Sequence, residues 1–182
     1  MDTPGPRVRR PSAVLFDRDG TLVVDVPYNG DPAAVRPMPG AVEAVARVRA
    51  AGLPTAVVSN QSGIARGIVD ADRVAAVNAR VDAVFGAFDA WCVCPHAPGD
   101  GCRCRKPRPG LVLDAARRLG VDPADVVVIG DIGADVAAAE AAGARGILVP
   151  TPVTRPEEVA AATEVAPDLA AAVGLALEGG AA

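Results

Sequence analysis

The chain has few aromatic residues, no excess of positive charge and no long apolar segment. Aromatic residues make up 3% of its 182 residues, so alanine, valine and leucine must fill the core. The formal net charge of −4 argues against a nucleic-acid surface, because binding to a phosphate backbone normally needs a basic face. No apolar run approaches the ~20 residues of a membrane span. We therefore expect one domain that binds neither nucleic acid nor membrane.

The N-terminal segment also lacks the features of a secretory signal. It carries Arg7, Arg9 and Arg10, but no apolar stretch follows them. We predict a disordered arm over residues 1–11, a single domain over residues 12–182 and a cytoplasmic location. Inside the cell, clustered cysteines bind metal more often than they form disulfides.

Short apolar runs alternate with segments of helical periodicity along the chain. The runs that predict strands are residues 13–16, 55–58, 88–93, 126–129 and 146–149. The segments that predict helices are residues 39–51, 74–85, 109–119 and 135–142, with a further short helix that opens near residue 168. This alternation predicts an α/β fold, with a parallel, Rossmann-like sheet in the middle of a three-layer sandwich.

Two carboxylates follow the first predicted strand. Asp17 and Asp19 come directly after residues 13–16, and Gly20 lets the backbone turn sharply. In an open α/β sheet, this carboxyl edge is where ligands bind. The two acids could hold a cation or share a proton, or they could belong to a solvated turn without chemistry.

Polar side chains also follow two later strands. Ser59 comes after residues 55–58, where its hydroxyl could cradle an anionic oxygen or serve only the turn. Asp131 comes after residues 126–129 and offers the hard oxygen ligand that Mg²⁺ prefers. Asp135 could equally be the N-cap of the helix that follows.

A dense group of thiols and an imidazole occupies residues 94–104. Thiolate and imidazole at this spacing suit Zn²⁺ and fill all four tetrahedral positions, which predicts a structural zinc loop with the ligands Cys94, His96, Cys102 and Cys104. The alternative is a set of reduced surface thiols beside an ordinary histidine. We expect the remaining thiol, Cys92, to be a buried core residue rather than another ligand.

Two cations directly follow this loop. A loop ordered by metal would fix where Arg105 and Lys106 point, which is the preorganisation that a phosphate site needs. Lys106 would then neutralise a transferring phosphoryl group, and Arg105 would hold the other end of the substrate. Without the loop, both residues would be ordinary solubilising side chains.

These motifs together resemble a known family. Asp17-Arg18-Asp19-Gly20-Thr21 resembles the first motif of the haloacid dehalogenase superfamily of phosphatases. From about residue 13 to about residue 149, the chain is similar to the heptose-bisphosphate phosphatases and their histidinol-phosphatase relatives. The string over residues 60–67 matches the heptose branch. Ser59 stands where threonine is usual, and Ile132 stands where heptose-specific relatives can carry a lysine, which leaves the sugar open.

The resemblance implies a Mg²⁺-dependent phosphomonoester hydrolase without a large cap domain, acting through an aspartyl-phosphate. Asp17 would be the nucleophile, and Asp19 would serve as acid and then as base. Ser59 and Lys106 would share the charge of the phosphoryl group. Mg²⁺ would be held by Asp17, the backbone carbonyl of Asp19 and Asp131.

The resemblance also implies a set of substrate contacts and a substrate. Asp25 and Tyr28, on the irregular loop over residues 23–37, match positions that contact substrate in the heptose phosphatases, although Tyr28 could simply pack on the loop. The expected substrate contacts are Asp25, Tyr28, Ser59, Asn60, Arg105 and Lys106. We expect a monomer that removes the 7-phosphate of D-glycero-D-manno-heptose 1,7-bisphosphate. Histidinol phosphate or another small phosphomonoester is the alternative substrate, and a non-enzymatic, zinc-stapled binding module is the alternative of another class.

Overall fold

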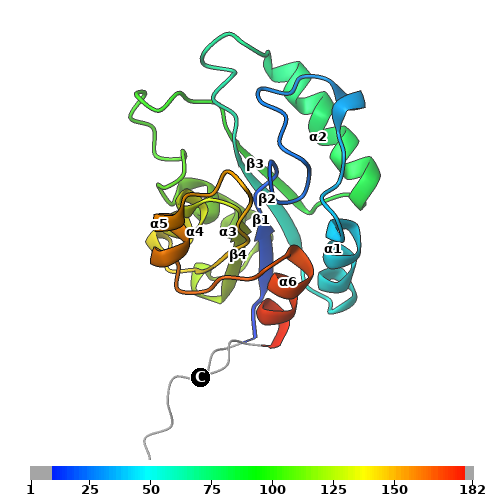
Figure 1. Cartoon of the computed structure of the whole chain (residues 1–182), viewed down its shortest axis with the longest axis vertical. Coiled ribbons are helices and arrows are strands. Elements are labelled where there is room, and N and C mark those ends of the chain that lie inside the picture. Colours follow the sequence, from blue (N-terminus) through cyan, green and yellow to red (C-terminus); the bar gives the residue numbers. More distant parts are fainter. Residues whose placement is uncertain (1–9, 179–182) are drawn as a thin grey trace, which may run out of the picture.

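The computed structural model of the chain describes residues 10–178. These residues form an α/β fold in which helices cover both faces of a parallel sheet (Figure 1). The predicted fold class is therefore confirmed. The predicted disordered arm falls almost wholly on residues 1–9, which lie outside the described residues. No helix within residues 10–178 is both long enough and apolar enough to cross a membrane.

The sheet of the described residues has five parallel strands in the order β3-β2-β1-β4-β5. Every residue of the two central strands β1 and β4 is buried, as expected for valine-rich strands that are covered on both faces. The strands match the predicted runs to within two residues at either end. They are β1 (Ala13–Phe16), β2 (Thr55–Asn60), β3 (Ala90–Cys94), β4 (Val126–Gly130) and β5 (Arg145–Leu148).

Within residues 10–178, six α-helices and two short 3₁₀ turns connect and flank these strands. The helices are α1 (Ala41–Ala50), α2 (Ala71–Phe85), α3 (Gly110–Leu119), α4 (Gly133–Ala141), α5 (Pro156–Ala161) and α6 (Leu169–Glu178). The 3₁₀ turns are Pro32–Ala34 and Pro123–Asp125. Helix α5 lies where the sequence predicted no helix. Its start signals are clear in retrospect, because Pro156 occupies the first turn and Glu158 accepts a hydrogen bond from the Arg155 amide.

Alternate residues of the central strand pack into two separate cores. Val14 and Phe16 belong to the core that contains α1, α2 and α6. Ala13 and Leu15 belong to the core that contains α3 and α4. This strict alternation places the helices in two layers, one on each side of the sheet.

The chain order reverses beside β1, which sets the position of the site. From β1 the chain builds β2 and β3 on one side and then crosses to build β4 and β5 on the other. The crevice at such a switch point, beyond the carboxyl ends of β1 and β4, is the usual ligand site of an open α/β sheet. Asp17 follows β1 and Asp131 follows β4, so both emerge into this crevice.

Candidate active site

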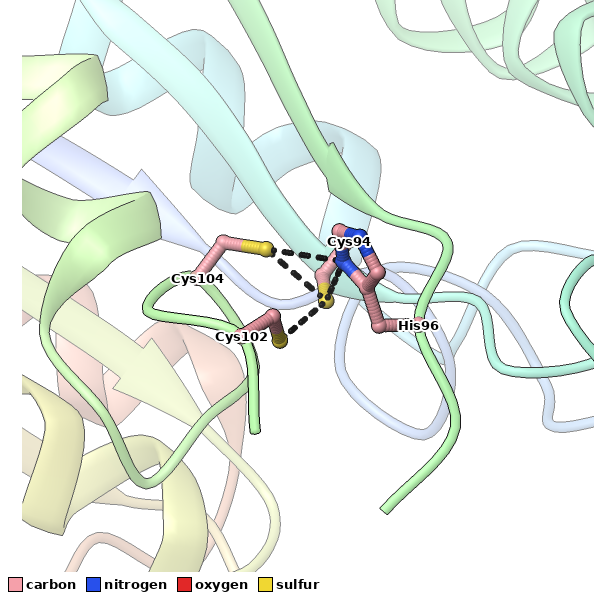
Figure 2. Close-up of side chains that lie close together, drawn as sticks. All are labelled: Cys94, His96, Cys102 and Cys104. Atoms are coloured by element: carbon pink, nitrogen blue, oxygen red, sulfur yellow. Dashed lines mark hydrogen bonds between the residues drawn. The ribbon is translucent and has the colours of Figure 1, made fainter. Parts of the chain in front are cut away.

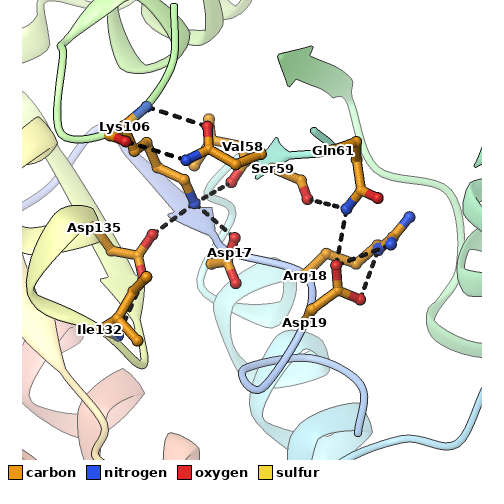
Figure 3. Close-up of polar contacts among 10 residues, drawn as sticks. Asp17, Arg18, Asp19, Val58, Ser59, Gln61, Lys106, Ile132 and Asp135 are labelled. Atoms are coloured by element: carbon orange, nitrogen blue, oxygen red, sulfur yellow. Dashed lines mark hydrogen bonds and ion pairs between the residues drawn. The ribbon is translucent and has the colours of Figure 1, made fainter. Parts of the chain in front are cut away.

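Lys106, the only lysine in the sequence, lies buried among acceptors at the carboxyl edge of the sheet (Figure 3). Its Nζ lies 2.6 Å from Asp17 Oδ1 and 2.5 Å from Asp135 Oδ1, and it donates a hydrogen bond to the Val58 carbonyl at 2.8 Å. Burial alone would lower the pKa of this ammonium, but the two carboxylates raise it above its ordinary value. Lys106 is therefore held as a cation directly beside Asp17.

Three buried carboxylates surround this cation. Oxygen atoms of Asp17, Asp131 and Asp135 all lie within 4.8 Å of one another, and each of the three residues is at most 7% exposed. If all three are ionised, they exceed the single charge of Lys106 by two, which a divalent cation would balance. Burial and the neighbouring Asp135 raise the pKa of Asp131 to about 7, as expected of a crowded, desolvated acid. The hard oxygen donors fit Mg²⁺.

A glycine allows this cluster to close. Gly20 has a φ of +83°, and a Cβ placed on it would lie 2.3 Å from Asp131 Oδ2. Any other residue would be strained in its backbone and would also collide with the Asp131 carboxylate. The turn after β1 can therefore lie against the end of β4.

Asp135 does two things at once. At the third position of α4, its Oδ2 accepts a hydrogen bond from the Ile132 amide at 3.2 Å, while Oδ1 faces Lys106. The sequence left open whether Asp135 serves the helix start or the site. The structure places it at both, although the N-cap position itself is occupied by Ile132.

Asp19 lines a cavity together with Asp17 and Asp131, but its side chain is held by a different set of groups. Arg18 forms a two-point contact with it, from Nε to Oδ1 at 3.0 Å and from Nη2 to Oδ2 at 2.8 Å. Gln61 Nε2 also donates to Asp19 Oδ2, at 2.8 Å. The side chain of Asp19 thus lies outside the carboxylate cluster of Asp17, Asp131 and Asp135.

Ser59 and Asn60 are the last two residues of β2, whereas the predicted strand ended at residue 58. Ser59 is buried, and its hydroxyl accepts a hydrogen bond from Gln61 Nε2 at 2.8 Å (Figure 3). The Asn60 side chain holds the backbone of Lys106 at two points: Oδ1 accepts from the Lys106 amide at 3.1 Å and Nδ2 donates to the Lys106 carbonyl at 3.2 Å. Asn60 lines the cavity, but both ends of its amide are already engaged.

The cavity above these groups has a volume of about 350 Å³. Its floor contains Asp17, Asp131 and Lys106, and its mouth is formed by the loop that carries Asp25 and Tyr28. Tyr28 has a φ of 54°, an uncommon conformation for a tyrosine. The Arg66 guanidinium donates a hydrogen bond to its hydroxyl and stacks 5.2 Å from its ring centre. This contact fixes the mouth loop over the carboxyl end of the sheet.

Comparison with known proteins identifies the family. A sequence profile described as HAD-hydrolase-like matches residues 103–172. Over 143 residues the chain is 38% identical to the D-glycero-beta-D-manno-heptose-1,7-bisphosphate 7-phosphatase of Bordetella bronchiseptica, which covers 76% of this chain and 80% of that protein. The chain is a phosphatase of the HAD-like family. It is also 39% identical over 163 residues to the protein of the same name from Vibrio cholerae, covering 82% of this chain and 88% of that one.

A solved structure of a relative has the same architecture as this HAD-like phosphatase. The D,D-heptose 1,7-bisphosphate phosphatase of B. bronchiseptica, complexed with magnesium and phosphate, superposes with a TM-score of 0.80 at 35% sequence identity. The superposition covers 91% of this chain and 98% of that one. The resemblance inferred from the motifs is thus confirmed at the level of the family and of the fold.

The phosphatase also contains the predicted cysteine and histidine cluster, at the end of β3 and in the following loop (Figure 2). Cys94 Sγ lies 3.7 Å from Cys102 Sγ and 3.1 Å from Cys104 Sγ, and His96 Nδ1 lies 3.5 and 3.3 Å from the Sγ atoms of Cys94 and Cys104. Tetrahedral zinc–thiolate bonds of about 2.3 Å would set sulfur atoms roughly 3.8 Å apart. The four donors therefore fit a zinc ion with a small outward adjustment.

Burial raises the pKa of the Cys94 thiol to about 12, with the neighbouring Cys104 adding to the effect. Binding of Zn²⁺ at this site would therefore require the Cys94 thiol to lose its proton to solvent as the metal enters.

Cys92 differs from this cluster. It is 2% exposed, as predicted for a core cysteine, and its Sγ donates to Asp114 Oδ2 at 3.3 Å. Burial and Asp114 raise its pKa to about 12. Its thiol points toward α3 and takes no part in the cluster of Figure 2.

The structure does not bring Arg105 to the catalytic cavity. Arg105 contacts the His96 carbonyl at 3.4 Å and lines a separate cavity together with Cys102 and Arg108. Arg105 does not line the cavity that contains Asp17 and Asp131, and its contact with the far end of a substrate stays a prediction. The physical reason for the position of Arg105 is that consecutive side chains of this loop point to different sides. Lys106 points inward to the cavity, so Arg105 points away from it.

Sequence reasoning also missed three residues of the site. Gln61 connects Ser59 to Asp19, and Arg18 connects Asp19 to Asn78 on α2. The role of Arg18 could have been inferred from the sequence, because a cation between the two carboxylates of the motif is expected to pair with one of them. Nothing in the sequence named Asn78 as that partner.

Proposed function

We propose that the chain is a Mg²⁺-dependent phosphomonoester hydrolase that forms an aspartyl-phosphate on Asp17. The observation that carries this proposal is the cluster of Asp17, Asp131 and Asp135 around Lys106 at the end of the sheet. It combines a nucleophile, a cation and an excess of buried negative charge that suits a divalent metal.

Asp17, Asp131 and the backbone carbonyl of Asp19 would hold the Mg²⁺. A metal bound there would offset the repulsion between an anionic nucleophile and an anionic phosphate. Asp135 would hold Lys106 through its ion pair, while Lys106 donates a hydrogen bond to the transferring phosphoryl group. The Ser59 hydroxyl would also approach the charge of this group if its hydrogen bond from Gln61 breaks.

The chemistry divides into two displacements. In the first, an Asp17 carboxylate oxygen bonds to phosphorus, the bond from phosphorus to the sugar oxygen breaks, and Asp19 gives a proton to that oxygen. In the second, Asp19 takes a proton from water, the water oxygen bonds to phosphorus, and the bond to Asp17 breaks. Inorganic phosphate and free Asp17 are the products.

Asp19 must exchange contacts to do this work. Both of its oxygens accept hydrogen bonds, from Arg18 and Gln61. Transfer of a proton to the sugar oxygen requires the Gln61 contact to give way to a contact with the substrate. Asp25 and Tyr28 line the same cavity as Asp17 and would bind the sugar.

The substrate that we propose is D-glycero-D-manno-heptose 1,7-bisphosphate, cleaved at the 7-phosphate. The support comes from the names of the relatives that align over most of the chain. Ile132, where heptose-specific relatives can carry a lysine, is the position that tests this choice. Zinc in the loop of residues 94–104 would be structural, and we propose a cytoplasmic monomer.

The test is phosphate release from the 1,7-bisphosphate and from histidinol phosphate, each with and without Mg²⁺. We expect Mg²⁺-dependent release that favours the bisphosphate, and loss of that release in Asp17→Asn. Equal rates on both substrates would refute the heptose assignment. An Asp17→Asn protein that released phosphate at the original rate would refute the mechanism, and no turnover under any condition would favour a binding module.

A further inference from the structure

Arg18 is an unusual buried residue in this fold. It is 1% exposed, although a guanidinium is among the groups that are most costly to bury. Two of its nitrogens form the fork on Asp19, and the third, Nη1, donates to Asn78 Oδ1 at 2.8 Å. Among the described residues, Asn78 is the hydrogen-bond partner of this guanidinium that belongs to another element, helix α2.

The contacts from Asn78 through Arg18 fix the orientation of the Asp19 carboxylate. A planar guanidinium that meets a carboxylate at two points sets the plane of that carboxylate. A third contact, made 60 residues along the chain by α2, sets the plane of the guanidinium itself. The Asp19 carboxylate therefore takes its orientation partly from α2, and it takes the rest from Gln61 at the end of β2.

We propose that Asn78 is a positioning residue for phosphoryl transfer, which acts through Arg18 to hold the Asp19 carboxylate toward the leaving oxygen. This inference rests on the proposed function, in which Asp19 protonates that oxygen. Asn78 does not line the cavity, so it acts on the reaction only through Arg18. Its effect must then be confined to steps that need Asp19.

The leaving group provides the readout. A sugar alkoxide needs a proton as it departs, whereas p-nitrophenolate leaves readily without one. The parameter kcat/KM reports the steps up to phosphorylation of Asp17 and so excludes the later use of Asp19 as a base. For Asn78→Leu, we expect kcat/KM to fall about 10-fold for the sugar bisphosphate and to stay within twofold for p-nitrophenyl phosphate, since general acid catalysis as a whole supplies roughly 10²–10⁴-fold.

Two matched variants separate positioning from loosening of the helix. Asn78→Asp keeps an oxygen acceptor for Arg18 and should retain the wild-type ratio of the two kcat/KM values. Asp82→Ala removes contacts that tie the same helix to Phe88 and Trp91, but it touches neither Arg18 nor Asp19. It should lower the thermal midpoint and leave the ratio unchanged.

A double-mutant cycle completes the test. In an Asp19→Asn background, Asn78→Leu should have no further effect on the sugar bisphosphate, because the group that it positions is gone. Equal losses on both substrates, no loss on either, or additive losses in the cycle would overturn the inference while phosphatase activity itself persists. A wild-type protein inactive on both substrates would instead refute the proposed function, and the inference with it.

Discussion

Replacement of Lys106 by methionine removes the cation around which the site is built. Methionine has a similar length and no charge, so the change leaves Asp17 and Asp135 without the ammonium that lies 2.6 and 2.5 Å from them. Loss of one partner of a buried ion pair costs about 3–5 kcal/mol. For a domain of this size, that loss corresponds to a decrease in Tm of roughly 6–20 °C.

The pH dependence of that loss has a definite sign. Burial raises the pKa of Asp17 well above the ordinary value of an aspartate, and Lys106 opposes this rise. Without Lys106, the pKa must rise further, so above about pH 4 the folded state binds more protons than the unfolded state. Stability then falls as pH rises, and the difference in Tm between wild type and Lys106→Met should be larger at pH 8 than at pH 5.

Thermal unfolding in EDTA, followed by circular dichroism at both pH values, measures this directly. The control is Arg103→Met, which removes an exposed cation from the same loop and should change the stability by less than about 0.5 kcal/mol. Added Mg²⁺ should stabilise Lys106→Met more than wild type, because the unpaired carboxylates gain most from a cation. Equal Tm differences at pH 5 and pH 8, or a difference as small as that of the control, would refute the electrostatic reasoning. Phosphatase activity should fall by about 10²–10³-fold, as for loss of a donor to a transition-state oxygen.

Three further predictions rest on the contacts of the site, and one of them uses Lys106 as a reporter because the sequence contains no other lysine. Asn60→Ala should lose the two hydrogen bonds to the Lys106 backbone and about 1–3 kcal/mol of stability. Its kcat should fall by more than its KM changes. A change confined to KM would instead support a direct contact between Asn60 and substrate. Removal of zinc with a chelator should make Lys106 reactive toward amine-acylating reagents and abolish activity, and unchanged labelling would show that the loop does not depend on metal. After chelation, iodoacetamide at pH 8 should modify the partly exposed Cys102 and Cys104 before Cys92 and Cys94, which are buried and whose pKa values are raised to about 12. Mass spectrometry identifies the modified residues, and rapid modification of Cys92 would contradict its burial.

Much of the fold could be predicted because each strand and helix has a local signature. Five short apolar runs became five strands, and the helices ended close to the expected residues. Helix α5 was missed because it is only six residues long, and a single turn and a half leaves little periodicity to detect. The convergence of Asp17, Lys106 and Asp131 followed from one rule, that the carboxyl ends of parallel strands meet at one edge.

The contacts of individual side chains were less predictable. No local pattern indicated that the Asn60 amide holds the Lys106 backbone. No local pattern indicated that Arg105 lines the neighbouring cavity with Cys102 and Arg108. Each arrangement depends on the direction in which a side chain leaves the backbone, and the direction is set by packing rather than by residue type.

The sequence by itself determined the alternation of strands with most of the helices, the family, the residue types of the candidate site and the cysteine and histidine pattern, because these depend on local periodicity and on motifs a few residues long. Only the tertiary structure decided that Asp135 pairs with Lys106 and that Arg18 reaches Asn78 on a distant helix. Such partners are selected by which buried charges come within about 3 Å of one another after the layers pack, and no local pattern encodes that distance.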